Sequence, residues 1–169
     1  LVILTEVLEQ LDDETYIKAI KEIKRLGSKY LLITVPFKEN IRLGLCKCSV
    51  CGNLFNRFHH YGKFDDFWFD KGFQQYQLQK IEYTSWRIPS NEKIAKLKRK
   101  FGVFDYNETA ICNKCGNQPQ RPNKILRYVF SGLAILDTII KRIFNIRRPY
   151  HQMILLRRKV KTFNTNTLP

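Results

Sequence analysis

The chain carries the pattern Cys-x-x-Cys-Gly-Asn twice, beginning at Cys48 and again at Cys112. Two thiolates three residues apart can hold one metal ion from a tight turn, and the glycine that follows permits the positive φ that turns backbone N–H groups toward the sulfurs. Two such turns supply four thiolates, which is the tetrahedral ligand set that zinc prefers. We therefore expect one structural Zn²⁺ that joins two distant parts of the chain. Its ligands would be Cys48, Cys51, Cys112 and Cys115.

Other interpretations of these cysteines are disulfides or unrelated buried thiols. No signal peptide is visible, and the thiols are grouped in pairs, so the pattern favours a metal site over disulfides. The fifth cysteine, Cys46, could replace Cys48 as a ligand, but Cys46 and Cys51 form a looser pair. We expect Cys46 to lie outside the metal site.

Length and charge limit the classes of protein that remain. A chain of 169 residues, 44% of them hydrophobic, corresponds to one domain with a packed core. The net charge of +15 favours a polyanion, a membrane surface or an acidic partner domain. No apolar run reaches the roughly 18 residues of a membrane-spanning helix. We expect a cytoplasmic protein that can also contact a membrane peripherally.

The first 36 residues predict a strand, a helix and a second strand. Leu1–Thr5 is a short apolar run, and Asp12, Asp13 and Glu14 then place acids at the start of a helix, where its dipole favours them. Gly27 suits the position after the last helical turn. Tyr30–Val35 is a second apolar run, which ends at Pro36. This order predicts parallel strands and an α/β fold class.

The remaining elements are less regular. The patterns predict a short helix at Phe64–Lys71, a strand at Tyr76–Tyr83, a basic helix at Asn91–Lys100, a long helix at Lys124–Asn145, a strand at Met153–Leu156 and a disordered polar tail from Lys161.

Two stretches of the chain resemble the class I S-adenosylmethionine-dependent methyltransferases. They are Glu6-Val-Leu-Glu-Gln-Leu11, after the first strand, and Tyr30-Leu-Leu-Ile-Thr-Val-Pro36. The first cysteine pair, with Phe55, His60 and Phe64, is similar to a Cys-Pro-x-Cys-Gly-x-x-Phe-His-x-x-Gly-His-x-Arg-Ser-Phe insertion of a bacterial subgroup. The closing helix, Arg148-Pro149 and the last strand also fit that subgroup.

The resemblance implies the C-terminal portion of a Rossmann-like methyltransferase sheet with an inserted four-cysteine zinc module. Leu1 would lie in the fourth strand of that sheet, so the family's glycine-rich cofactor loop would precede it. The chain starts at Leu1 without Met, and we expect a fragment that is inactive and binds S-adenosylmethionine poorly by itself. The implied divisions are 1–36, strand-helix-strand of the core; 37–63, first cysteine insertion; 64–90, helix and strand; 91–123, basic helix and second cysteine insertion; 124–160, amphipathic helix and last strand; and 161–169, tail.

The resemblance also implies roles for residues after the first strand. Glu6 would line the cofactor or acceptor pocket, because ligands of open α/β sheets bind beyond the carboxyl ends of the strands; otherwise it is a solvated loop acid. Glu9 faces a similar choice. Some relatives hold a metal with a Glu-x-x-Glu-His pattern at this point, but Gln10 stands here in place of the histidine. His60 could be the general base for an acceptor hydroxyl; the alternatives are loop packing against Phe58 and Tyr61, or a spare metal ligand.

Two functions remain open. The first is methyl transfer to a small-molecule or glycan-type acceptor. The second is a zinc-stapled binding module for nucleic acid or an anionic membrane surface, for which the basic side chains at Lys93–Lys100, Arg121, Lys124 and Arg127 would provide contacts. Such a charge run is by default a solvated face, and the apolar stripe of Lys124–Asn145 by default packs on its own protein.

Overall fold

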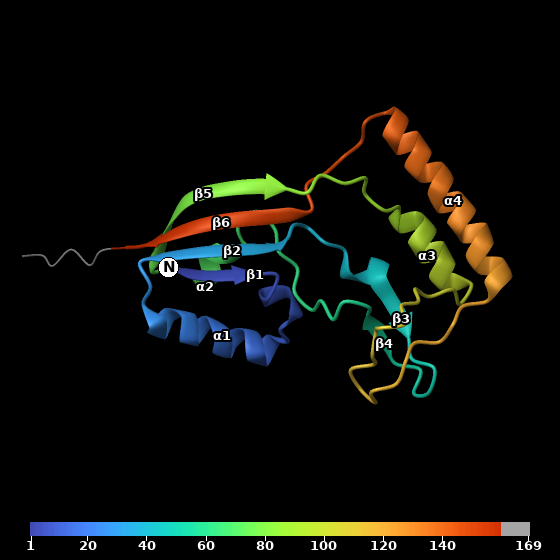
Figure 1. The fold of residues 1–169 in the computed structure, drawn as a ribbon, viewed down its shortest axis with the longest axis horizontal. Coiled ribbons are helices and arrows are strands. Elements are labelled where there is room, and N and C mark those ends of the chain that lie inside the picture. Colours follow the sequence, from blue (N-terminus) through green and yellow to red (C-terminus); the bar gives the residue numbers. More distant parts are fainter. Residues whose placement is uncertain (160–169) are drawn as a thin grey trace, which may run out of the picture.

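A four-stranded mixed sheet forms the larger part of the molecule (Figure 1). The structure is a computed structural model and describes residues 1–159; the tail predicted to be disordered lies outside them. The strand order is β1 (Val2–Thr5), β2 (Tyr30–Pro36), β6 (His151–Arg158) and β5 (Tyr76–Thr84). β1 and β2 are parallel, and β6 is antiparallel to both β2 and β5. β1, β2 and β5 therefore end at the same edge of the sheet.

The predicted unit of strand, helix and strand is confirmed. Helix α1 spans Asp13–Leu26 and begins where the Asp12 carboxylate accepts a hydrogen bond of 2.8 Å from the Thr15 amide. It ends at Gly27, whose φ of 61° is the left-handed conformation that glycine adopts without strain. Parallel pairing of β1 with β2 then follows from the crossover through α1.

Both helices of this part pack on one face of the sheet. The buried side chains of β2 and β6 contact those of α1 and of the short helix α2 (Trp68–Gly72) in one cluster, which includes Ile20, Ile23, Leu31, Ile33, Phe69, Phe73, Ile154 and Leu156. Ile3, Leu32 and Leu155 are paired across the strands and lie on the opposite face, where Ile3 is 55% exposed and the other two are half-buried. One face of the sheet is thus closed and the other is partly open.

Some element boundaries differ from the prediction. The helix expected at Phe64–Lys71 begins only at Trp68, because Phe64 forms a parallel bridge with Phe37 and the Asp65 carboxylate then closes a turn on the Phe67 amide. Strand β2 includes Pro36, which was expected to stop it, because Pro36 lies at the end of the ladder opposite His151. Strand β6 is longer than the predicted Met153–Leu156.

The rest of the chain forms a second layer beyond the carboxyl edge of the sheet (Figure 1). Residues 37–63 leave after β2, and residues 85–150 leave after β5 and return into β6. They contain a two-stranded sheet that the sequence did not indicate, β3 (Leu45–Lys47) and β4 (Leu54–Asn56), together with the predicted helices α3 (Glu92–Lys100) and α4 (Lys124–Ile143). Two short 3-10 segments, Leu8–Gln10 and Ile41–Gly44, complete the described elements. Segments expected as separate insertions therefore lie together.

Candidate functional site

The two cysteine pairs meet in one cluster, as the repeated motif predicted. The sulfurs of Cys48, Cys51, Cys112 and Cys115 all lie within 4.8 Å of one another. The Sγ atoms of Cys48 and Cys115 are 3.4 Å apart, and those of Cys51 and Cys112 are 3.7 Å apart. Four ligands bound tetrahedrally at a Zn–S distance of about 2.3 Å would be separated by roughly 3.8 Å. The cluster therefore has the dimensions of a site that could hold one metal ion.

The two cysteine turns are built in the same way. In the first, the Cys48 amide donates a hydrogen bond of 2.8 Å to the Asn53 carbonyl; in the second, the Cys112 amide donates one of 2.8 Å to the Asn117 carbonyl. The glycine of each turn has a positive φ, 69° at Gly52 and 73° at Gly116. A Cβ atom at Gly116 would have no neighbour within 4 Å, so the backbone conformation, rather than lack of space, favours glycine there.

Side-chain amides of the two asparagines donate to the sulfurs. Asn53 Nδ2 lies 3.7 Å from Sγ of Cys112, so it connects the first turn to the second, and Asn117 Nδ2 lies 3.4 Å from Sγ of Cys115. The side-chain and backbone amides of Asn117 lower the pKa of Cys115 to about 6. Hydrogen bonds of this kind stabilise a thiolate, which is the form that binds metal.

Cys46 stays outside this cluster. It is the middle residue of β3, pairs with Phe55 of β4, and is fully buried in a small apolar core that also includes Ala110. Burial raises the pKa of Cys46 to about 11, so it remains a neutral thiol at physiological pH. This position agrees with the expectation that Cys46 is not a ligand.

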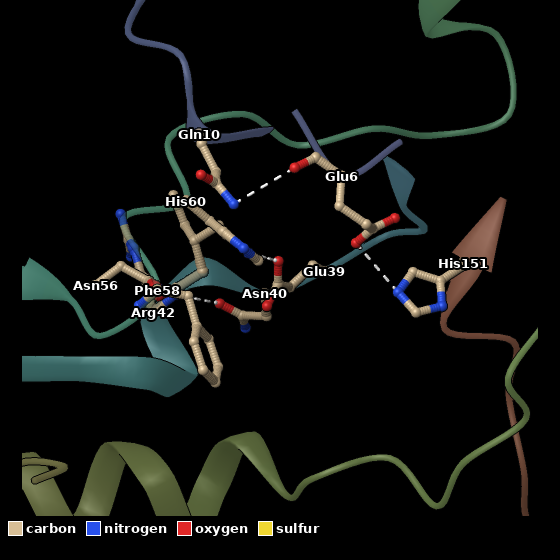
Figure 2. A network of polar contacts seen from close by, with 10 residues as sticks. Glu6, Gln10, Glu39, Asn40, Arg42, Asn56, Phe58, His60 and His151 are labelled. Carbon is tan, nitrogen blue, oxygen red and sulfur yellow. Dashed lines mark hydrogen bonds and ion pairs between the residues drawn. The ribbon is translucent and has the colours of Figure 1, made fainter. Parts of the chain in front are cut away.

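A group of charged side chains lies where β1 and β2 end (Figure 2). Glu6 follows β1 with a φ of 53°, which is uncommon for a residue other than glycine, and its amide donates to the Thr34 carbonyl. Its Oε2 atom is 3.2 Å from Nε2 of His151. Its Oε1 atom is buried and has no hydrogen-bond partner among the described residues.

His60 is paired with Glu39, a residue that the sequence did not single out. The Nδ1 atom of His60 is 2.6 Å from Oε2 of Glu39, and the two side chains are only 9% and 16% exposed (Figure 2). Burial by itself lowers the pKa of His60, but the hydrogen bond and charge of Glu39, together with the charges of Glu9 and Glu6, outweigh it and raise that pKa above its ordinary value. The His60 ring also lies against the Phe58 ring, at a centroid distance of 5.6 Å. His60 is therefore both packed in its loop and held by a carboxylate.

Glu9 is fully buried, and neither of its carboxylate oxygens has a hydrogen-bond partner among the described residues. Burial raises the pKa of Glu9. Its backbone carbonyl accepts hydrogen bonds from the amides of Tyr61 and Gly62, so it fixes the loop that carries His60. Over residues 1–159 the four-cysteine cluster alone has the geometry of a metal site, and Glu9 is not part of it.

A cavity of about 270 Å³ lies between this edge of the sheet and the pair of helices α3 and α4. Glu39 and Phe58 line it on one side, and Arg87, Arg148 and Tyr150 line it on another. The Arg87 guanidinium lies over the Tyr150 ring. A cavity lined by carboxylates, guanidinium groups and aromatic rings suits a polar ligand that has both hydrogen-bond donors and acceptors.

The sequence did not indicate three residues of this region: Glu39, Tyr150 and His151. They belong to no motif, but each stands next to the end of a strand at the edge where open α/β sheets bind ligands. Glu39 follows β2 by three positions and was detectable on that basis. Tyr150 and His151 could be placed only once β6 was known to enter the sheet between β2 and β5.

Comparison of the chain with protein-family models, with curated proteins and with solved structures finds no match.

Proposed function

We propose that this chain supplies the C-terminal half of a class I S-adenosylmethionine-dependent methyltransferase. The observation that carries the proposal is the sheet itself. In that family the seventh strand lies antiparallel between the fifth and the sixth, and the fourth is parallel to the fifth. Here β1, β2, β5 and β6 would correspond to strands four, five, six and seven. Their order in the sheet, β1-β2-β6-β5, and their directions then agree with the family's arrangement.

The unequal faces of the sheet support the same proposal. In such a protein the strands and helices of the first half would lie beside β1 and over the open face. β1 pairs with β2 alone among the described strands, and Leu1 and Ile3 are 71% and 55% exposed. These are the surfaces that the first half would cover.

The charged group at the ends of β1 and β2 provides residues for methyl transfer. S-adenosylmethionine, when bound, supplies a methyl group already activated on a sulfonium sulfur, so the protein must mainly position the acceptor. His60 would accept the proton of an acceptor hydroxyl as the oxygen–methyl bond forms, and Glu39 would hold the ring and stabilise the resulting imidazolium. The unpartnered Oε1 of Glu6 would accept a hydrogen bond from the cofactor or the acceptor.

The cavity beside Glu39 is the candidate acceptor site; His60 does not line it, so an acceptor bound there would extend past Glu39 to reach the ring. Its mixed lining fits a polar small molecule or a glycan-type acceptor that carries hydroxyl groups. Arg87 and Arg148 would favour an acceptor that also bears negative charge.

The four cysteines would hold a structural Zn²⁺. Four sulfur ligands suit zinc and leave no open position for water, so such an ion stabilises the fold and does not activate a nucleophile.

Cofactor binding tests the proposal. The gene region preceding the codon for Leu1 should be expressed together with this chain, and S-adenosylmethionine binding should be measured by isothermal titration calorimetry. We expect binding by the longer protein and none by residues 1–169 alone. In the longer protein, Glu6→Gln should weaken binding by about tenfold or less, in line with the loss of one hydrogen bond to a charged group. Glu22→Gln, which alters an exposed acid on α1, is the matched control.

Failure of the longer protein to bind S-adenosylmethionine would overturn the methyltransferase proposal. Micromolar binding by residues 1–169 alone would overturn the claim that the cofactor is held mainly by the first half.

A further inference from the structure

Helix α4 exposes a continuous apolar face. Six aliphatic side chains that share one side of the helix are each at least 50% exposed; we refer to them as the α4 outer face. They are Ile125, Val129, Ile135, Leu136, Ile139 and Ile143. A single exposed apolar residue needs no explanation, but a row of six along a helix of 20 residues marks a surface that binds something.

The contacts of the opposite side fix the orientation of this helix. Phe130 is buried against Phe101 of α3, with ring centroids 6.0 Å apart. The Asp137 carboxylate accepts a hydrogen bond of 2.7 Å from the Asn91 side chain, and Lys141 donates one of 2.9 Å to the Pro89 carbonyl. Turning the α4 outer face inward would break these contacts, so this face points away from the protein.

Basic side chains border the α4 outer face. Residues 124–148 include six Lys or Arg side chains and one acid, Asp137, which is paired with Lys141. Lys124, Arg127 and Arg142 are exposed beside the apolar row, and Arg147 and Arg148 follow the helix. On and directly after α3, Leu97 and Phe101 are also exposed, as are Lys93, Lys96 and Lys100.

We propose that α4 binds in the plane of a membrane interface that contains anionic lipids. An aliphatic face bordered by Lys and Arg matches the acyl chains on one side and the anionic headgroups on the other. Among the described residues no helix combines the length and the apolar character needed to cross a bilayer, so α4 would lie along the surface. At about 1.5 Å per residue its 20 residues would cover roughly 30 Å of that surface.

The same observations disfavour other partners. A nucleic acid would require cations and several stacking aromatic rings at the centre of the surface, whereas the α4 outer face has no cation and Tyr128 is the one exposed aromatic side chain of α4. In an antiparallel dimer of two copies, the basic borders would face each other and repel. The other half of a methyltransferase would lie beside β1, whereas Figure 1 shows α4 beyond the carboxyl edge of the sheet, with α3 between it and the strands.

Vesicle co-sedimentation of the 169-residue chain tests the proposal. We expect binding to phosphatidylcholine vesicles that contain phosphatidylserine and much weaker binding to phosphatidylcholine alone. Ile135→Asn with Ile139→Asn should reduce binding to the anionic vesicles by about tenfold or more, since two apolar side chains lose their burial. The control, Ser131→Asn with Thr138→Asn, introduces the same residue on the polar side of α4, where no apolar side chain is lost, and should alter binding by less than about twofold.

Both double variants replace exposed residues, and circular dichroism at equal concentration verifies that α4 is retained in each. Equal binding of the two variants, or equal binding to neutral and anionic vesicles, would overturn the proposal. The proposal would also be overturned if the chain bound no vesicles and instead bound a single-stranded oligonucleotide tightly. The same holds if it bound no vesicles and dimerised with increasing concentration in sedimentation velocity. None of these measurements depends on methyltransferase activity.

Discussion

At the scale of single residues, the pair formed by His60 and Glu39 gives the most direct test of the candidate site. Because the folded state raises the pKa of His60, the pair stabilises the fold fully below the ordinary histidine pKa of about 6.5, and this stabilisation is lost as the pH rises through the higher, folded value. Glu39→Gln should therefore lower the pKa of His60, measured by NMR titration. It should also lower the free energy of unfolding, by about 2 kcal/mol at pH 6 and by less at pH 8.

Glu22→Gln provides the comparison, since Glu22 is an exposed acid on α1 that pairs with Arg25. It should leave the pKa of His60 unchanged. If the pKa of His60 were the same in the Glu39→Gln variant as in the natural sequence, Glu39 would not be the residue that controls this histidine.

At the scale of elements, β1 is the strand whose stability depends most on what lies beside it. It is four residues long, pairs with β2 alone among the described strands, and has an exposed Ile3. An unpaired strand edge frays and can also template association. We expect amide hydrogens of Val2–Leu4 to exchange much faster than those of Leu32–Val35 in a monomeric sample of the chain. The cause is that β2 has a partner on both sides.

Sedimentation velocity verifies that the sample is monomeric. Strong protection of Val2–Leu4 in a monomer would contradict the assignment of β1 as a free edge. In the longer protein described above, the same amides should become protected.

The elements that sequence reasoning placed well are those with local physical signals. Helix α1 has a capping carboxylate at Asp12 and a glycine at its end, and the cysteine turns have a spacing that few other structures require. β3 and β4 were missed because three residues give no usable periodicity, and their pairing depends on the chain closing around the cysteines. The candidate site was predicted only in part. Glu6 and His60 lie near recognisable motifs, whereas Glu39 is identified only by its contact with His60, 21 positions away in the sequence.

At the scale of the whole molecule, the buried apolar side chains of the described residues form two separate clusters. One lies between the sheet and helices α1 and α2, and the other is a small cluster of five residues around the cysteines. A cluster of that size buries little apolar surface, so the cysteine centre must supply much of the order in its part of the chain. Cys51 and Cys112 are 61 positions apart, and closing a loop of that length restricts the unfolded chain by about 4 kcal/mol on the chain-entropy model.

We therefore expect about one zinc per chain by elemental analysis, and its removal by a chelator should destabilise the cysteine centre more than the sheet. Hydrogen exchange should increase in β3, β4 and residues 103–120, whereas β2 and β6 should stay protected. Cys112→Ser should abolish stoichiometric zinc, and Cys46→Ala, which alters the cysteine outside the cluster, should retain it. Purified protein without bound zinc, or zinc loss in Cys46→Ala equal to that in Cys112→Ser, would show that the cluster is not the site.

The places where the second layer joins the sheet have a consequence for how such a protein can change over evolution. The segment after β2 leaves at Phe37 and returns at Phe64, which are bridged to each other, and the segment after β5 is closed by a bridge between Arg87 and Arg148. Each insertion thus begins and ends at neighbouring positions, so its length can change without shifting the register of any strand. The sheet can therefore stay constant while the second layer is lengthened, shortened or replaced. That layer carries the cysteines, the cavity wall and α4.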